Sequence, residues 1–284
     1  MKNKLFFLPL LFASIAGFVG CNNKKATGTE SGNSSSGAKW ETGIALYSFH
    51  HHPFTTALAM ADSAGVKYVE GFSFYKLGAD FNDSTMGKLD KQGIARMKQM
   101  LKEKRIKMSS MYVDGARNVD DWKKYFELAN ELDLQYLVCE PAKDHWDMID
   151  SLAGLYKIKI AIHEHARESA YWHPDSVLAA IKGHANIGAC ADLGHWVRSG
   201  LDPVKCLQML DGHIIGIHLK DVDDKGTDVD PGTGKIDFAA VVKELKRQNF
   251  TGIIDVECEH NMDNNLADVK QALGYITEMA KKEN

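Results

Sequence analysis

Residues 187–196 read IGACADLGHW, and residues 214–222 read IIGIHLKDV. Each stretch is an apolar run that ends in acid and imidazole groups, and runs of this length are typical of buried parallel strands. Because side chains alternate along a strand, Cys190 and Asp192 share one face of the first run, and His218 lies near the end of the second. Metal-binding groups at the carboxyl ends of neighbouring parallel strands predict an α/β barrel with its site at that end.

Strand-like and helix-like runs alternate along the rest of the chain from residue 43. Besides the two opening runs, we expect strands at 44–49, 66–70, 106–113, 135–140, 158–163 and 253–257. We expect helices at 54–64, 92–104, 120–132, 146–156, 174–182, 203–210, 238–247 and 266–281. Eight β/α units in alternation predict a single-domain (β/α)8 TIM barrel. An open doubly wound sheet is the alternative, but the Gly-rich phosphate turn typical of it is missing after the first strand.

The amino-terminal region has the pattern of an export signal. A basic start and an apolar run over 5–19 predict a signal peptide at 1–20, because the run is shorter than the roughly 20 residues of a membrane span. The ending FVGC resembles a bacterial lipobox, which implies cleavage before Cys21 and lipidation of that residue; an ordinary signal peptide is the alternative. Residues 21–39 are rich in Gly, Ser and Asn and predict a flexible tether before a catalytic domain at 40–284. We expect an exported lipoprotein, held at the membrane only by its lipid and facing the periplasm.

Composition excludes some classes of protein. The formal net charge of −4 gives no sign of a nucleic-acid footprint, so no nucleic-acid partner is expected. Four cysteines follow Cys21 and lack CxxC spacing, so a cysteine zinc site is not expected.

Acids and imidazoles stand at or near the predicted carboxyl ends of six strands: Glu70, Glu140, His163, Asp192, His218 and Glu257. Burying so many ionisable groups is costly unless they are paired or bind a cation. A mixed carboxylate and imidazole site suits one divalent ion, with Mn²⁺ as the first expectation and Co²⁺, Zn²⁺ or Mg²⁺ as alternatives.

Several further residues are candidates for substrate contact: Glu70, His165, His195, Lys220 and Trp196. His195 would bind substrate or metal, or cap the next helix. Lys220 would neutralise a developing oxyanion or pair with Asp221. Trp196, with Tyr171 and Trp172, would stack on a sugar face or belong to the core.

Weaker candidates complete the set. Arg198 is a candidate substrate clamp. The triple histidine at 50–52 would place one imidazole over the site or remain solvated.

The motifs together resemble a known family. The runs at 192–195, 218–221, 230–237 and 252–257 are similar to those of xylose isomerase-like TIM barrels, which include sugar phosphate isomerases/epimerases, ketose 3-epimerases and inosose dehydratases. The resemblance covers about residues 43 to 280. The His-Glu-His pattern at 163–165 resembles the inosose dehydratase-like branch more than the ketose epimerases.

The resemblance also implies a ligand set. Family members hold a divalent metal with acid and His ligands, which here match His163, Asp192, His218 and Glu257. Many epimerases have Glu where this chain has His163, which puts the usual pair of catalytic glutamates in doubt. Glu140 is the candidate for the missing carboxylate, as a ligand or as the base.

The function expected on this basis is a metal-dependent sugar isomerase or epimerase. Glu257, Glu140 or a free His163 would abstract a proton next to a carbonyl, through a metal-stabilised enediolate. The substrate would be a small carbohydrate, and the predicted export favours a free sugar over a sugar phosphate. Two alternatives remain: a lyase that eliminates the aglycone from 3-keto-glycosides, and a sugar-binding lipoprotein without catalysis.

Overall fold

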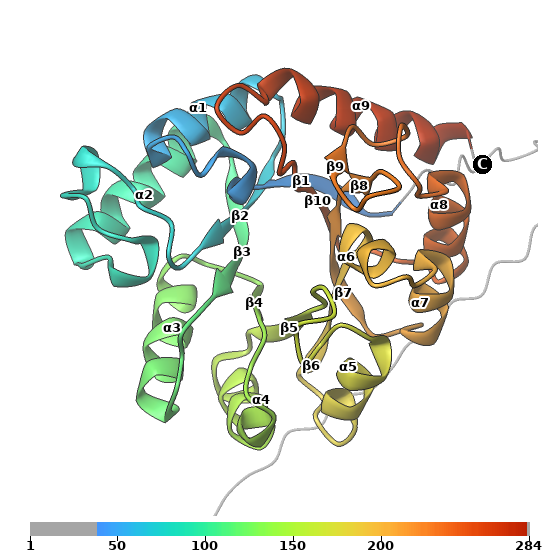
Figure 1. The fold of residues 1–284 in the computed structure, drawn as a ribbon. Coiled ribbons are helices and arrows are strands. Elements are labelled where there is room, and N and C mark those ends of the chain that lie inside the picture. The colour runs from blue at the N-terminus through green and yellow to red at the C-terminus, as the bar shows by residue number, and fades with distance from the viewer. Residues whose placement is uncertain (1–38, 283–284) are drawn as a thin grey trace, which may run out of the picture. The chain divides into compact units, whose positions relative to one another are not determined.

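The computed structural model describes residues 39–282, and its centre is a closed barrel of eight parallel strands (Figure 1). The strands follow the order β1-β10-β7-β6-β5-β4-β3-β2 around the barrel. Their bounds are β1 Glu41–Ala45, β2 Tyr68–Phe72, β3 Lys107–Val113, β4 Tyr136–Cys139, β5 Lys159–His163, β6 Ile187–Asp192, β7 Ile214–Leu219 and β10 Ile253–Val256. A two-stranded hairpin, β8 Asp221–Val222 and β9 Asp228–Val229, follows β7.

Helices surround the barrel in the alternating order expected (Figure 1). They are α1 Phe54–Ser63, α2 Lys91–Lys104, α3 Val119–Glu131, α4 Trp146–Tyr156, α5 Pro174–Ile181, α6 Leu193–Arg198, α7 Pro203–Met209, α8 Phe238–Arg247 and α9 Leu266–Lys282. Short 3-10 helices cover Leu46–Phe49, Ala79–Phe81, Met86–Lys88 and Lys143–His145. The (β/α)8 fold predicted from the sequence is therefore confirmed.

The barrel interior holds a small cluster of its own, separate from the larger core between strands and helices. Its buried members are Tyr136, Val138, Ala161 and Cys190. At Gly216 a Cβ would lie 2.9 Å from the Tyr136 hydroxyl oxygen, so the glycine makes room for that ring. Filling the interior with side chains leaves the functional groups at the carboxyl ends of the strands.

The structure corrects two details of the expected elements. The first strand ends at Ala45, and Leu46–Phe49 form a 3-10 helix rather than a continuing strand. His195 lies within helix α6, which is absent from the expected helices, because the Asp192 carboxylate accepts the backbone N–H of His195 and starts the helix directly at the end of β6. Asp192 and His195 are thereby fixed on consecutive, rigid elements.

The predicted signal peptide, the predicted lipidation site Cys21 and nearly all of the predicted tether lie outside the described residues. Within residues 39–282, none of the helices has the length and apolar character needed to cross a bilayer.

Candidate active site and metal centre

Four side chains from four neighbouring strands converge at the carboxyl end of the barrel. His163 ends β5, Asp192 ends β6, His218 lies on β7, and Glu257 directly follows β10. One ligand atom of each lies within 4.8 Å of those of the other three, and all four residues are buried. The family resemblance implied these same four ligands, with Glu140 as a further candidate.

The distances and unpaired atoms within this group fit a cation. Nε2 of His163 lies 3.5 Å from Oδ2 of Asp192, and Nδ1 of His218 lies 3.1 Å from Oε2 of Glu257. Ligands bound 2.0–2.2 Å from a tetrahedral ion lie about 3.3–3.6 Å apart, close to these separations. In the described part of the chain, Oδ2 of Asp192 and Nδ1 of His218 are buried without a hydrogen-bond partner, although Oδ2 of Asp192 forms an ion pair with Lys220. A bound ion would satisfy both atoms.

His218 is oriented by a carboxylate behind it. Its Nε2 donates to Oε1 of Glu70 at 2.9 Å, and Glu70 in turn accepts the hydroxyl of Ser110 at 2.6 Å. The second ring nitrogen, Nδ1, is therefore directed towards Asp192 and Glu257. A histidine with one nitrogen on a carboxylate and the other free is the usual arrangement of a metal ligand.

A second carboxylate, Glu140, lies beside His163, but beyond hydrogen-bond distance. Nδ1 of His163 lies 3.6 Å from Oε1 of Glu140, while Nε2 faces Asp192. Tyr112 and Ser169 donate hydrogen bonds of 2.8 and 2.5 Å to the two oxygens of Glu140. Glu140 was predicted as a metal ligand and as a base; it lies outside the group of four and contacts the outer nitrogen of His163 instead.

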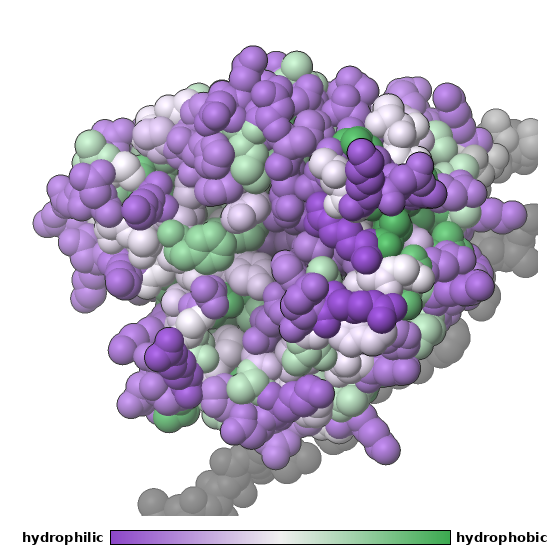
Figure 2. Space-filling view, viewed as in Figure 1, coloured by the Kyte–Doolittle hydropathy of each residue, from purple (hydrophilic) through white to green (hydrophobic). Residues whose placement is uncertain are grey.

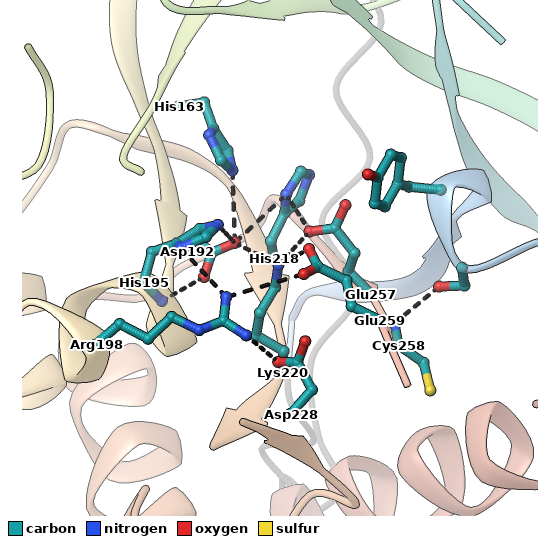
Figure 3. A network of polar contacts seen from close by, with 12 residues as sticks. His163, Asp192, His195, Arg198, His218, Lys220, Asp228, Glu257, Cys258 and Glu259 are labelled. Carbon is teal, nitrogen blue, oxygen red and sulfur yellow. Dashed lines mark hydrogen bonds and ion pairs between the residues drawn. The ribbon is translucent and has the colours of Figure 1, made fainter. Parts of the chain in front are cut away.

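Lys220 balances the charge of the carboxylates. Its ammonium lies 3.2 Å from Asp192, 2.9 Å from Glu257 and 2.5 Å from Glu259, and the side chain is 2% exposed (Figure 3). A Cβ on Gly194 would overlap the Lys220 side chain, so the glycine of the Asp-Leu-Gly-His run provides the space that the lysine occupies.

Neighbouring charges shift the pKa values of the ionisable groups in the site. Burial raises the pKa of Asp192 and of Glu257, but the positive charge of Lys220 and the neighbouring histidines together outweigh burial and hold both pKa values below their usual range. Burial lowers the pKa of His163, yet its contacts with Asp192 and Glu140 raise it above the ordinary value. Both carboxylates are therefore ionised at neutral pH, as metal ligands must be.

A pocket of about 460 Å³ opens over the site. One side carries His163, His218 and Glu257 together with Glu259, and the other side is aromatic. Its lining also includes Tyr47, Phe72, Phe74, Tyr112, Asp114, His165 and His195. Figure 2 shows that the visible face is mostly hydrophilic, with scattered hydrophobic side chains among the polar ones.

His195 presents a neutral imidazole to this pocket. Burial lowers its pKa to about 2. Nη1 of Arg198 lies 3.3 Å from Nδ1, and because a guanidinium can only donate, Nδ1 accepts and Nε2 carries the proton. His195 packs against His165, with 4.0 Å between ring centroids. Arg198, predicted as a substrate clamp, instead pairs with Asp228 at 2.7 Å.

The predicted substrate residues separate into two groups. His165 and His195 line the pocket, whereas Glu70, Lys220 and Trp196 do not belong to its lining. Trp196 is fully buried, so the indole belongs to the core.

The triple histidine also stays away from the pocket lining. His50 stacks on Tyr47 with ring centroids 4.2 Å apart, and His51 pairs with Asp263 at 2.9 Å.

Sequence reasoning missed the aromatic side of the pocket and Glu259. Phe72 and Tyr112 lie at the carboxyl ends of β2 and β3, and Glu259 shares its strand parity with Glu257. Extending the parity argument from acids and histidines to all strand-end residues would have found these three. Tyr47 and Phe74 lie outside the strands, where strand parity does not apply.

Comparison with known proteins assigns the family. Residues 58–279 match the model of the xylose isomerase-like TIM barrel family, so this chain belongs to that family. A search of curated proteins finds no match to the sequence.

Solved structures share the fold along nearly their whole length. A putative uncharacterized protein from Parabacteroides distasonis ATCC 8503 is 33% identical, with a TM-score of 0.70 over 85% of this chain and 99% of that one. The IolI protein with a bound zinc atom is 18% identical, with a TM-score of 0.70 over 86% and 99%. A D-tagatose 3-epimerase-like protein is 18% identical, with a TM-score of 0.68 over 85% and 98%.

Proposed function

We propose that this chain is a metal-dependent enzyme that moves a proton next to the carbonyl of a carbohydrate, as an isomerase or epimerase. The observation that carries the proposal is the convergence of two histidines and two carboxylates, with unpaired buried atoms, beneath one pocket. The epimerase-like and zinc-containing structural neighbours support a sugar substrate and a divalent ion.

His163, Asp192, His218 and Glu257 would hold the ion. When bound, a divalent ion supplies Lewis-acid polarisation of a carbonyl and its adjacent hydroxyl. Mn²⁺ remains our first expectation for its identity, and the zinc-containing neighbour keeps Zn²⁺ as an alternative.

Glu257 is the best-placed base. It belongs to the group of four and also lines the pocket, so its carboxylate reaches both the ion and a substrate carbon. The positive charges of Lys220 and His218 hold the pKa of Glu257 low against the effect of burial, so the group is ionised at neutral pH. Lys220, 2.9 Å away, stabilises that ionised form.

His195 is the best-placed hydrogen-bond donor. Its Nε2–H lies on the pocket side, 3.9 Å from Oδ2 of Asp192, and Nδ1 is occupied by Arg198. A neutral imidazole donor can stabilise a developing oxyanion on the substrate without repelling the cation. Glu259, which also lines the pocket, is the second carboxylate available to return a proton.

Elimination from a 3-keto-glycoside is the second candidate, and the aromatic side of the pocket favours it. Phe74 is 42% exposed at the pocket and contacts Phe72 and Tyr112 edge-on. An apolar aglycone beside the reacting sugar would cover that exposed ring. The same base would remove the proton, and the aglycone oxygen would leave with a proton from a neighbouring donor.

The test is exchange of solvent deuterium into carbonyl sugars by the full chain, with and without added Mn²⁺, Co²⁺ or Zn²⁺. We expect metal-dependent exchange, reduced at least about 10²-fold in Glu257→Gln. Release of an aglycone from 3-keto-glycosides in place of exchange would select the lyase. Absence of both reactions while sugars still bind would overturn the enzyme assignment in favour of a binding protein.

Export as a lipoprotein belongs to the same proposal. The predicted lipidation of Cys21 is tested by radiolabelled palmitate incorporation and by membrane fractionation of the full chain. We expect a labelled, membrane-bound protein that becomes unlabelled in Cys21→Ser. An unlabelled wild-type protein would contradict the proposal and remove the argument for a free-sugar substrate.

A further inference from the structure

A second cluster of side chains that can bind a metal begins at Cys258, the residue after Glu257 of the first group. Glu257 and Glu259 belong to the polar network, whereas the sulfur of Cys258, between them, is directed away from it (Figure 3). One ligand atom each of Cys258, His260 and Asp268 lie within 4.8 Å of one another. None of these three residues has a part in the proton transfer proposed above.

The distances match those of a tetrahedral zinc site. Sγ of Cys258 lies 3.5 Å from Nδ1 and 3.7 Å from Nε2 of His260. Nε2 of His260 lies 3.8 Å from Oδ2 of Asp268 and 3.2 Å from Oδ1 of Asp230. In a tetrahedral zinc site, with Zn–S of about 2.3 Å and Zn–N of about 2.0 Å, the cysteine sulfur and the histidine nitrogen lie about 3.5 Å apart.

The ligand types and their exposure suit an ion with one open position. The thiol is buried, whereas the side chains of His260 and Asp268 are 25% and 24% exposed. Asp230, 32% exposed on the loop after the β8–β9 hairpin, lies 3.2 Å from Nε2 of His260 but does not belong to this group of three. Cysteine, histidine and aspartate together favour Zn²⁺ or Co²⁺ over the hard cations Mg²⁺ and Ca²⁺.

The backbone holds the cysteine in place without using its sulfur. The N–H of Cys258 donates to Oγ of Ser48 at 2.8 Å, and its carbonyl accepts Nδ2 of Asn265 at 3.2 Å. Asn265 is fully buried and also donates to the carbonyl of Ser48. The thiol is therefore positioned on a fixed backbone, as a preformed ligand requires.

We infer that Cys258, His260 and Asp268 form a second binding site for a thiophilic divalent cation of the Zn²⁺ class. Such an ion would join two segments: the strand end at Cys258–His260 and the first turn of α9, which carries Asp268. Because Cys258 lies between Glu257 and Glu259, the ion would also fix the strand end that presents both carboxylates to the pocket.

Cobalt distinguishes the two sites, because only the second offers a thiolate. The full chain is freed of metal with a chelator and titrated with Co²⁺, and the near-ultraviolet absorption is recorded. We expect a thiolate-to-cobalt charge-transfer band that saturates within two equivalents, since the first site also takes Co²⁺. The band should disappear in Cys258→Ser and in His260→Gln, which changes a less buried ligand. The band should persist in Cys206→Ser, a control that removes a buried cysteine outside the cluster.

The same titration separates this inference from the proposed enzyme. His218→Ala should lose the first site and keep the band, since none of the ligands of the second site is changed. A wild-type chain that shows no band with excess Co²⁺, or a band that survives in folded Cys258→Ser, would overturn the second site and leave the proposed function untouched. Circular dichroism of each variant confirms that it is folded.

Discussion

The two sides of the pocket differ in how they are built. The polar side takes His163, Asp192, His218 and Glu257 from consecutive positions around the barrel, β5, β6, β7 and β10. The aromatic side takes Phe72 and Tyr112 from β2 and β3, and completes the wall with Tyr47 and Phe74 from outside the strands. The polar side is fixed by the sheet and by buried charges, whereas the aromatic side carries no buried charge and depends in part on residues outside the strands. We therefore expect changes to the polar side to alter metal binding and stability, and changes to the aromatic side to alter substrate affinity.

The largest effect should follow loss of the positive charge on the polar side. Lys220→Met leaves Asp192 and Glu257 buried without their ammonium partner, which should cost about 3–5 kcal/mol of unfolding free energy in the metal-free chain. A bound divalent ion should recover part of this loss, because it neutralises the same two carboxylates. Urea unfolding with and without metal measures both effects.

The matched control for Lys220→Met is Lys104→Met. The pair of Lys104 with Asp62 is partly exposed, so its loss should change the unfolding free energy by less than about 1 kcal/mol. Equal costs for the two variants would contradict the charge-balancing role of Lys220.

A smaller effect is expected from loss of the carboxylates that face the outer nitrogens of the two histidine ligands. Glu70→Gln and Glu140→Gln remove the carboxylates that orient His218 and His163, and each should weaken metal binding about 10–100-fold. Titration calorimetry measures the affinity, with Glu103→Gln on α2 as the control. Unchanged affinity in both variants would show that the outer carboxylates do not position the ligands.

Changes to the aromatic side should alter substrate affinity and leave metal affinity nearly unchanged. Phe74→Ala removes a half-exposed ring, so we expect KM for the substrate to rise about tenfold, with kcat and metal affinity nearly unchanged. The control is Leu155→Ala, which removes an exposed apolar side chain on α4. A fall in metal affinity in Phe74→Ala would mean that the two sides are not independent.

The smallest effect concerns pH. The pKa of His163 is raised, so the protonated ring competes with the metal, and metal affinity should fall as pH decreases through that raised pKa. Glu140→Gln removes one of the groups that raise the pKa, so the fall should begin at a lower pH in this variant. Metal titrations between pH 5 and about 8 measure the displacement. If metal affinity fell at a higher pH in Glu140→Gln than in the wild type, Glu140 would not be one of the groups that raise the pKa of His163.

Much of the polar side could be predicted because strand parity and chemistry point to the same residues. His163 and Asp192 follow from the alternation of their strands and from their place at the strand ends. The pairing of Glu140 and Glu70 with the outer nitrogens could not be predicted, because it depends on distances across the barrel. The second cluster was missed because the Cys-x-His spacing at 258–260 has no CxxC pattern, and Asp268 joins it only through the position of α9.

The central claim is that the polar side binds one divalent cation, and Mn²⁺ binding tests it most directly. The hard Mn²⁺ ion suits this oxygen- and nitrogen-rich site and disfavours the thiol-containing cluster. Equilibrium dialysis of the full chain should give about one Mn²⁺ per chain, and His218→Ala should retain none at the same free concentration. A wild-type chain that binds no Mn²⁺, Co²⁺ or Zn²⁺, or a His218→Ala chain that binds Mn²⁺ as tightly as the wild type, would contradict the account.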